Sequence, residues 1–178
     1  MTGENKELTF EEVKRQASLE QQQQDVGKMI QLIIFKLGDE EYALNIDQIK
    51  EVVLTPGIAK IPQTPDYIIG VSNIRGNIIA IVDLEAKFGL HKEEDNIVKG
   101  NYTLVVESDT FKIGILVKEV PDTMTVAENS IDNSSMILQY SNLDQECIKG
   151  IVKNGERMII LVDMIKMMEA EKFHELIN

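Results

Sequence analysis

The sequence contains one internal repeat, and this repeat limits the possible folds more than any other feature. Seven positions of the first half match positions of the second half, with identical or similar residues, at a constant offset of 80. The matched residues are Gly70, Val71, Ile79, Ile81, Val82, Asp83 and Leu84 in the first half and Gly150, Ile151, Ile159, Leu161, Val162, Asp163 and Met164 in the second. A shorter match pairs residues 50–52 with residues 118–120, both Lys-Glu-Val. The repeat predicts two similar units that follow one another.

Each half consists of short β-branched and apolar runs separated by turn residues, the pattern of strands in a small sandwich or barrel. The strands expected in the first half cover residues 30–37, 42–46, 51–54, 67–71 and 78–82. Those expected in the second half cover residues 103–107, 111–117, 123–126, 148–153 and 157–162. Asn154-Gly155 lies between the last two strands and is a strong signal for a two-residue hairpin turn.

A unit of five short strands buries little apolar surface by itself, so we expect each unit to curl into a small barrel and to pack against its copy. Closure also leaves fewer exposed strand edges. The predicted fold class is therefore all-β: two five-stranded barrels packed side by side as a pseudo-duplication, with short connecting helices and a C-terminal helix. The sequence leaves open whether strands are exchanged between the two lobes.

The pattern divides the chain into four parts. Residues 1–28 form a polar arm, in which a capping box at Thr9 to Glu12 allows a short helix, with an arm lacking stable structure as the alternative. Residues 29–88 are expected to form the first barrel lobe and residues 89–165 the second. Residues 166–178 are assigned to the C-terminal helix, whose apolar pattern begins at Met164.

Charge and hydropathy exclude several kinds of partner. The chain has 18 basic and 30 acidic residues, a net charge of -12, whereas nucleic-acid phosphates require clustered Lys and Arg. We therefore expect no nucleic acid as a partner. No apolar run approaches the roughly 20 residues that cross a bilayer, so direct membrane insertion is not expected either. The N-terminal residues lack the apolar core of a signal peptide, which predicts a cytoplasmic protein.

The sequence offers few residues for catalysis or for metal binding. It has two His, one Cys and no Trp. Cys147 has no companion thiol and is expected to be a small buried side chain. His174-Glu175 resembles the start of a metalloprotease helix motif, but the second His is absent. We expect no cofactor, no metal and no catalytic residues, and therefore a protein that is not an enzyme.

Asp83 and Asp163 are the one pair of carboxylates that suits a catalytic interpretation. Each follows a buried type of strand and precedes a helical stretch, where a side-chain oxygen accepts hydrogen bonds from free backbone N–H groups. We predict that both residues are helix caps. The alternative is a small carboxylate-dependent hydrolase, which requires both side chains in a shared cleft.

The two halves differ in one turn. The second half uses the compact Lys153-Asn154-Gly155-Glu156, and the first half uses Asn73-Ile74-Arg75-Gly76. This asymmetry favours a specialised loop at residues 73–76, with a role in binding.

At these residues the sequence resembles the CheW family, the scaffold proteins that couple bacterial chemoreceptors to the histidine kinase CheA. The resemblance covers about residues 29–168. It includes residues 37–44, the Pro-x-x-Pro-x-Tyr-Ile-x-Gly-Val stretch at residues 62–71, and the Asn-Leu-Arg-Gly signature. The signature is present with Ile74 in place of Leu, a mild change that keeps the polar residues.

The resemblance implies a non-catalytic cytoplasmic chemotaxis adaptor built from two five-stranded barrels with an apolar interface. It implies that the cytoplasmic tip of methyl-accepting chemoreceptors contacts Ile49, Glu51, Asn73 and Arg75. It implies that the regulatory domain of CheA contacts the surface that includes Pro62, Tyr67 and Gly70. Two related alternatives remain open, another CheW-like coupling module and the regulatory domain of the kinase itself.

Overall fold

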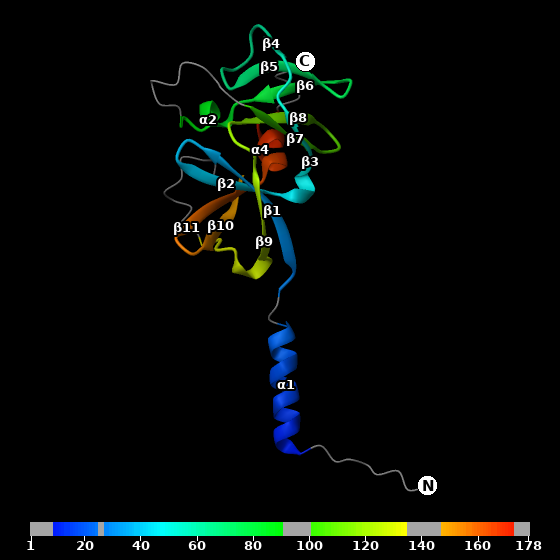
Figure 1. The fold of residues 1–178 in the computed structure, drawn as a ribbon, viewed down its shortest axis with the longest axis vertical. Coiled ribbons are helices and arrows are strands. Elements are labelled where there is room, and N and C mark those ends of the chain that lie inside the picture. The colour runs from blue at the N-terminus through cyan, green and yellow to red at the C-terminus, as the bar shows by residue number, and fades with distance from the viewer. Residues whose placement is uncertain (1–8, 25–26, 91–100, 135–146, 173–178) are drawn as a thin grey trace, which may run out of the picture.

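The computed structural model describes residues 9–24, 27–90, 101–134 and 147–172, which form two curled sheets with a few helices (Figure 1). The first half of the chain contains β1 (Met29–Leu37), β2 (Glu40–Asn45), η1 (Ile46–Gln48), β3 (Ile49–Leu54), β4 (Ile58–Ala59), β5 (Ile68–Ile74), β6 (Asn77–Val82) and α2 (Leu84–Lys87). The second half contains β7 (Tyr102–Glu107), β8 (Lys112–Val117), β9 (Asp122–Ala127), η2 (Glu128–Ser130), β10 (Ile148–Asn154), β11 (Arg157–Val162) and α4 (Met164–Ala170). Every expected strand is present, and β4 is a short addition.

The strands form two sheets, each belonging to one lobe. The A lobe is the five-stranded sheet in the order β10-β11-β2-β1-β9, and the B lobe is the six-stranded sheet in the order β3-β7-β8-β6-β5-β4. The expected all-β fold with two small curled sheets is confirmed, and β4 accounts for the sixth strand of the B lobe.

The repeat appears in the structure as two equivalent hairpins, β5–β6 and β10–β11. Each hairpin contains a register shift at its repeated glycine, between Ile68 and Gly70 in one and between Ile148 and Gly150 in the other. The last strand of each hairpin then pairs in parallel with a strand from the other half of the chain, β6 with β8 and β11 with β2. The offset of 80 therefore marks a true structural duplication of this hairpin.

Each lobe combines strands from both halves, which answers the question of strand exchange. The A lobe joins β1 and β2 to β9, β10 and β11, and the B lobe joins β3 to β6 with β7 and β8. The expected boundary between residues 88 and 89 does not separate the two sheets. The physical reason is the parallel pairing, because two parallel strands need a long connection between them and so cannot be immediate neighbours in the chain.

Three apolar clusters hold the molecule together. One fills the interior of the A lobe, one the interior of the B lobe, and the largest lies between the lobes. β1 serves two clusters at once, since Leu32 and Ile34 point into the A lobe while Ile33, Phe35 and Leu37 point into the shared core. Strands buried on both faces read as continuous apolar runs. Each buried aliphatic side chain stabilises the fold by about 1.5–3 kcal/mol, so the shared core fixes the two lobes relative to one another.

Helix α4 packs into this shared core. Met164, Met167 and Met168 are buried there, with exposed fractions of 0%, 4% and 0%. The methionines fill the core. The structure describes the C-terminal helix to Ala170 and the chain to residue 172; residues 173–178 of the expected helix lie outside the described residues.

The N-terminal arm contains helix α1 (Phe10–Gln24), which stands apart from the two lobes in Figure 1. The expected capping box is formed, because Thr9 N donates to Glu12 Oε2 and Glu12 N donates to Thr9 Oγ1. Of the two expectations for the arm, the short helix is the one found. Within the described ranges, no helix has the length and apolar character needed to cross a membrane.

Candidate functional site

The structure brings Glu51 and Arg75 together, which the sequence did not determine. Glu51 lies in β3, and Arg75 lies in the turn between β5 and β6. Arg75 Nε is 2.5 Å from Glu51 Oε2. The arginine side chain is 74% exposed and the glutamate side chain 20% exposed. The guanidinium group is thus held at the surface while most of it remains free to meet a partner.

Asn73 shapes the turn that presents Arg75. Its Oδ1 accepts a hydrogen bond of 2.9 Å from Gly76 N. Arg75 has a positive φ of 50° and Gly76 has one of 86°. Residues other than glycine adopt this backbone conformation only at a cost in free energy. The Asn73 hydrogen bond helps to offset that cost. Asn73 therefore supports the position of Arg75 from within the turn.

Ile49 begins β3 and is half-buried against the shared core. The same strand exposes two apolar residues that the sequence reasoning missed, Val52 at 40% and Leu54 at 71%. Exposed and half-buried residues alternate along β3, so Val52 and Leu54 lie on the same exposed face as Lys50, and that charged residue is the one signal in the sequence for this face. On the neighbouring hairpin, Ile78 is 66% exposed and lies opposite Asn73.

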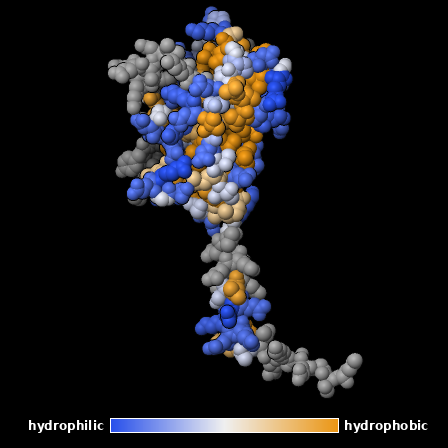
Figure 2. Space-filling model, viewed as in Figure 1, coloured by the Kyte–Doolittle hydropathy of each residue, from blue (hydrophilic) through white to orange (hydrophobic). Residues whose placement is uncertain are grey.

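These apolar residues belong to a wider surface. Figure 2 shows apolar side chains gathered over the B lobe on the side where β3 lies, with polar residues around them. Large exposed apolar areas rimmed by polar groups are typical of interaction sites. The Glu51–Arg75 pair is therefore accompanied on its own lobe by exposed apolar residues suited to protein binding.

Of the residues expected at the kinase contact, Pro62 and Tyr67 lie between β4 and β5, and Gly70 lies in β5. Pro62 is exposed, Tyr67 is half-buried and Gly70 is buried. A Cβ on Gly70 would lie 2.2 Å from the carbonyl oxygen of Ala59, in β4. Gly70 is therefore not a contact residue at the surface. Because it has no Cβ, β4 can lie close to β5, and this close approach sets the position of the loop that carries Pro62.

Tyr67 is held by two charged residues, Lys87 and Glu171, that no sequence motif indicates. Its hydroxyl donates to Glu171 Oε2 at 2.9 Å, and Lys87 Nζ lies 4.5 Å from the centre of its ring. Lys87 Nζ also forms an ion pair with Glu171. Burial, the hydrogen bond to Glu171 and the negative charge of that residue together raise the pKa of Tyr67 to about 12.

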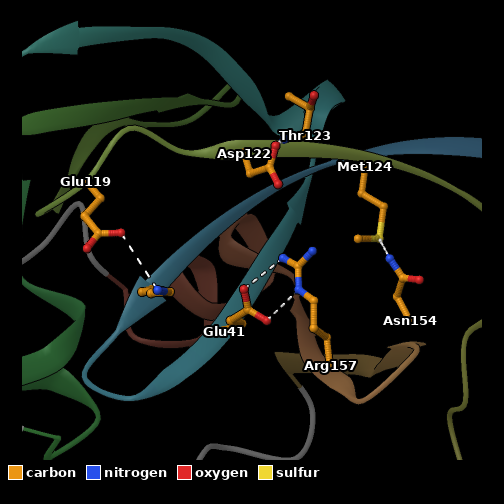
Figure 3. A network of polar contacts seen from close by, with 8 residues as sticks. Glu41, Glu119, Asp122, Thr123, Met124, Asn154 and Arg157 are labelled. Carbon is orange, nitrogen blue, oxygen red and sulfur yellow. Dashed lines mark hydrogen bonds and ion pairs between the residues drawn. The ribbon is translucent and has the colours of Figure 1, made fainter.

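The A lobe has its own charged pair, shown in Figure 3. Arg157, in β11, donates from Nε to Glu41 Oε2 at 3.0 Å and from Nη2 to Glu41 Oε1 at 2.8 Å. This hydrogen bonding lowers the pKa of the Glu41 carboxyl and raises the pKa of Arg157. The negative charge of Asp122 also raises the pKa of Arg157. Glu41 lies in β2 and Asp122 in β9, so the network joins strands from both halves of the chain.

Strand register shows which residues of the two lobes are equivalent. Reading across neighbouring strands gives Ile81, Gly114, Val105 and Glu51 in the B lobe, and Leu161, Ala43, Ile34 and Asp122 in the A lobe. Since Ile81 and Leu161 are repeat counterparts, Asp122 occupies the position of Glu51. The shorter sequence match, which pairs Glu51 with Glu119, is wrong as a structural equivalence, because Glu119 lies between β8 and β9.

The two lobes therefore share an acidic residue at one position but use it differently: Glu51 pairs with Arg75, whereas Asp122 acts through its charge on Arg157, which hydrogen-bonds to Glu41. In the B lobe Arg75 comes from the turn and is mostly exposed; in the A lobe Arg157 comes from the strand, and its side chain is 40% exposed. The turn asymmetry noted in the sequence is the cause of this difference. The two turns have the same length, since Ile74 pairs with Asn77 in one hairpin and Asn154 pairs with Arg157 in the other, so the expectation of a longer first turn is wrong. The difference is that Arg75 occupies the turn position where the other copy has Gly155.

Asp83 and Asp163 are helix caps, as predicted. Asp83 Oδ1 accepts from Ala86 N at 3.1 Å at the start of α2, and Asp163 Oδ1 accepts from Lys166 N at 3.0 Å at the start of α4. Asp163 Oδ1 also accepts from Gln48 Nε2 at 2.9 Å. Among the residues that the structure describes, no group of three or more His, Cys, Asp and Glu side chains has the arrangement of a metal site.

Comparison with known proteins identifies the family. Residues 31–172 match the CheW-like domain family. The Chemotaxis protein CheW of Helicobacter pylori is 32% identical over 171 residues, which are 96% of this chain and 99% of that protein. The Chemotaxis protein CheW of Klebsiella aerogenes is 33% identical over 145 residues, 80% of this chain and 83% of that protein.

A solved structure agrees with these sequence matches. The crystal structure of the scaffolding protein TtCheW from Thermoanaerobacter tengcongensis superimposes with a TM-score of 0.66 at 32% identity. The superposition covers 77% of this chain and 86% of that one. With its duplicated hairpin, its two curled sheets and these matches, the chain belongs to the CheW-like family of chemotaxis proteins.

Proposed function

We propose that this protein is a non-catalytic cytoplasmic adaptor that couples the cytoplasmic tip of chemoreceptors to the regulatory domain of the histidine kinase CheA. The observation that carries the proposal is the exposed Glu51–Arg75 pair, held on a turn that differs between the two copies of the repeat. Membership of the CheW-like family supports the same role. The mechanism is positional: the protein holds two partners in a fixed relative geometry.

The receptor surface is proposed to centre on Arg75. An arginine that keeps most of its guanidinium exposed suits an interface hot spot, and neighbouring apolar side chains exclude water from such a contact. Leu54, at 71% exposure in β3, and Ile78, at 66% in β6, are exposed apolar residues on the same lobe. Ile49, Glu51 and Asn73 then act mainly by placing these groups.

The kinase surface is proposed to lie at the loop between β4 and β5, which carries Pro62 and leads to Tyr67. Pro62 is exposed, and its fixed φ reduces the freedom of the free chain. Gly70 allows the loop to lie close to β5, as the short distance to Ala59 requires. A loop held in one conformation before binding loses less entropy when the partner arrives.

A scaffold of this kind needs its two surfaces on a rigid body, and polar links add to the shared core. Glu85 of α2 accepts from Gly38 N, in the β1–β2 turn of the A lobe, at 2.9 Å. Its other oxygen accepts from Lys118 Nζ at 2.9 Å, just after β8. A carboxylate with an exposed fraction of 7% therefore joins the β1–β2 turn of the A lobe to α2 and the end of β8.

The carboxylate-dependent hydrolase loses its basis in this arrangement. It requires Asp83 and Asp163 to act together in a cleft, but each carboxylate is engaged at the N-terminus of a different helix.

The proposed function is tested by titrating the full chain with the CheA regulatory domain and with a receptor fragment that contains the cytoplasmic tip. We expect each to bind and both to bind together, since the proposed contacts lie on different segments. Arg75→Ala is expected to weaken receptor binding and to leave kinase binding unchanged. Mutually exclusive binding of the two partners would contradict the scaffold mechanism.

A further inference from the structure

Helix α4 provides a fixed point beneath the proposed kinase surface. Its methionines are buried in the shared core, and its N-terminus is tied to the segment before β3. Gln48 Nε2 donates to Asp163 Oδ1 at 2.9 Å, and Gln48 Oε1 accepts from Met164 N at 3.2 Å. A short helix held by apolar packing along one face and by two side-chain hydrogen bonds at one end has little freedom to move.

The other end of α4 reaches the segment that leads into β5. Glu171, the residue that ends the helix, accepts the hydroxyl hydrogen bond of Tyr67 and pairs with Lys87 of α2. The Lys87 side chain is only 8% exposed and lies over the Tyr67 ring. The Glu171 side chain is 35% exposed, so the hydrogen bond lies at the surface and the cation–π contact beneath it. A charge-assisted hydrogen bond and a cation–π contact together restrict the ring more than either does alone.

Tyr67 is also held through its backbone, because its carbonyl oxygen accepts from Asp83 N at 2.8 Å. The loop before it is ordered locally, since Ile68 N donates to Pro65 O at 2.9 Å and Thr64 Oγ1 donates to Ile61 O at 3.2 Å. These contacts lie within the loop or at its base. The Tyr67 side chain is the link that ties the end of this loop to α4, and hence to the shared core.

We propose that Glu171 and Lys87 are positioning residues for kinase docking: they clamp the Tyr67 side chain to the end of helix α4 and so hold the Pro62-to-Tyr67 loop in its binding conformation. This inference rests on the proposed function. Neither residue contacts the kinase in this scheme. A loop that is released from the clamp must be ordered on binding, and that ordering lowers affinity.

The test compares variants of the full chain by titration with the CheA regulatory domain and, separately, with the receptor fragment. Glu171→Ala removes the hydrogen bond to the Tyr67 hydroxyl and the ion pair with Lys87. We expect the dissociation constant for the kinase domain to rise by about 3- to 10-fold. Glu171→Gln keeps an acceptor for the Tyr67 hydroxyl and is expected to recover part of the loss. Tyr67→Phe keeps the ring and removes the hydroxyl, and should show a partial loss of similar size.

Glu169→Ala is the matched control, since Glu169 is an exposed acid on the same helix. It should leave both affinities unchanged. Receptor affinity and melting temperature should stay near the wild-type values in Glu171→Ala, because α4 remains anchored by its methionines.

Three results would overturn the positioning role. One is an unchanged kinase affinity in Glu171→Ala; another is an equal loss of receptor and kinase affinity with a large fall in melting temperature. The third is a Glu169→Ala variant as weak as Glu171→Ala, which would indicate a general effect of charge. A wild-type chain that fails to bind the kinase domain would instead refute the proposed function, so the two failures are distinguishable.

Discussion

Arg157 donates two hydrogen bonds to the carboxylate of Glu41, at 3.0 and 2.8 Å, and thereby joins the parallel strands β11 and β2 of the A lobe. Two parallel donors on one carboxylate make a geometrically specific contact. Across the pseudo-duplication, the Arg75–Glu51 pair of the B lobe has a more exposed arginine on a turn. The two pairs therefore allow structural and binding roles of arginine to be separated within one chain.

Replacing each arginine by alanine is expected to affect a different property: receptor binding for Arg75 and stability of the fold for Arg157. Arg75→Ala should change the free energy of unfolding by about 0 to 1 kcal/mol, because exposed ion pairs stabilise little, and should weaken receptor binding. Arg157→Ala should lower the melting temperature by several degrees, because it leaves a half-buried carboxylate without its two-point partner, and should spare receptor binding. Calorimetry together with receptor titration measures both. The assignment fails if Arg75→Ala is the more destabilising change.

The Glu41 carboxyl should make the fold sensitive to acid. Its pKa lies below the ordinary value of 4.5 because Arg157 donates to it. A lowered pKa in the folded state means that the stabilisation is fully present above 4.5 and is lost as the pH falls through the lowered pKa. Denaturant unfolding at a series of pH values should therefore give a steeper acid loss for the wild type than for Glu41→Gln. Parallel curves for the two proteins would show that the pair contributes nothing to acid stability.

Tyr67 should make the fold sensitive to alkali. Its pKa is raised to about 12, first by burial and then by Glu171, from an ordinary value of 10.0. A raised pKa in the folded state means that the stabilisation is present below pH 10 and is lost as the pH rises toward 12. The alkaline loss should be smaller in Tyr67→Phe, which has no phenol to ionise at this position. Absorbance titration of the phenolates, wild type minus variant, measures the pKa directly; a value near 10 would contradict the packing described here.

Gly70 and Gly57 offer a matched pair of substitutions near β4. Gly70→Ala places a Cβ 2.2 Å from the Ala59 carbonyl oxygen, so β4 must move, and we expect a loss of about 1–3 kcal/mol in stability. Gly57→Ala meets nothing within 4 Å and should change stability by no more than about 0.5 kcal/mol. Kinase affinity should fall in Gly70→Ala and stay constant in Gly57→Ala. Equal effects of the two changes would remove the close approach as the reason for the glycine.

Much of the fold could be predicted from local patterns. Alternation and turn residues located the strands, because both depend on neighbouring residues in the chain. The offset between Gly70 and Gly150 found the duplicated hairpin, because each copy is formed by a continuous stretch of sequence that can be compared with the other. The caps Asp83 and Asp163 were predictable because a capping side chain bonds to backbone only three residues away. The prominence of Arg75 also followed from comparing two short turns.

The sequence by itself determined the strand positions, the duplicated hairpin, the capped helices and the unusual turn, because each depends on contacts within a few residues. Tertiary structure alone decided that β2 pairs with β11 and β8 with β6, and so exchanged strands between the lobes. It also decided that Arg75 meets Glu51 and that Glu171 clamps Tyr67. Periodicity tells which face of a strand is buried, but the partner across that face is chosen by the packing of the whole chain.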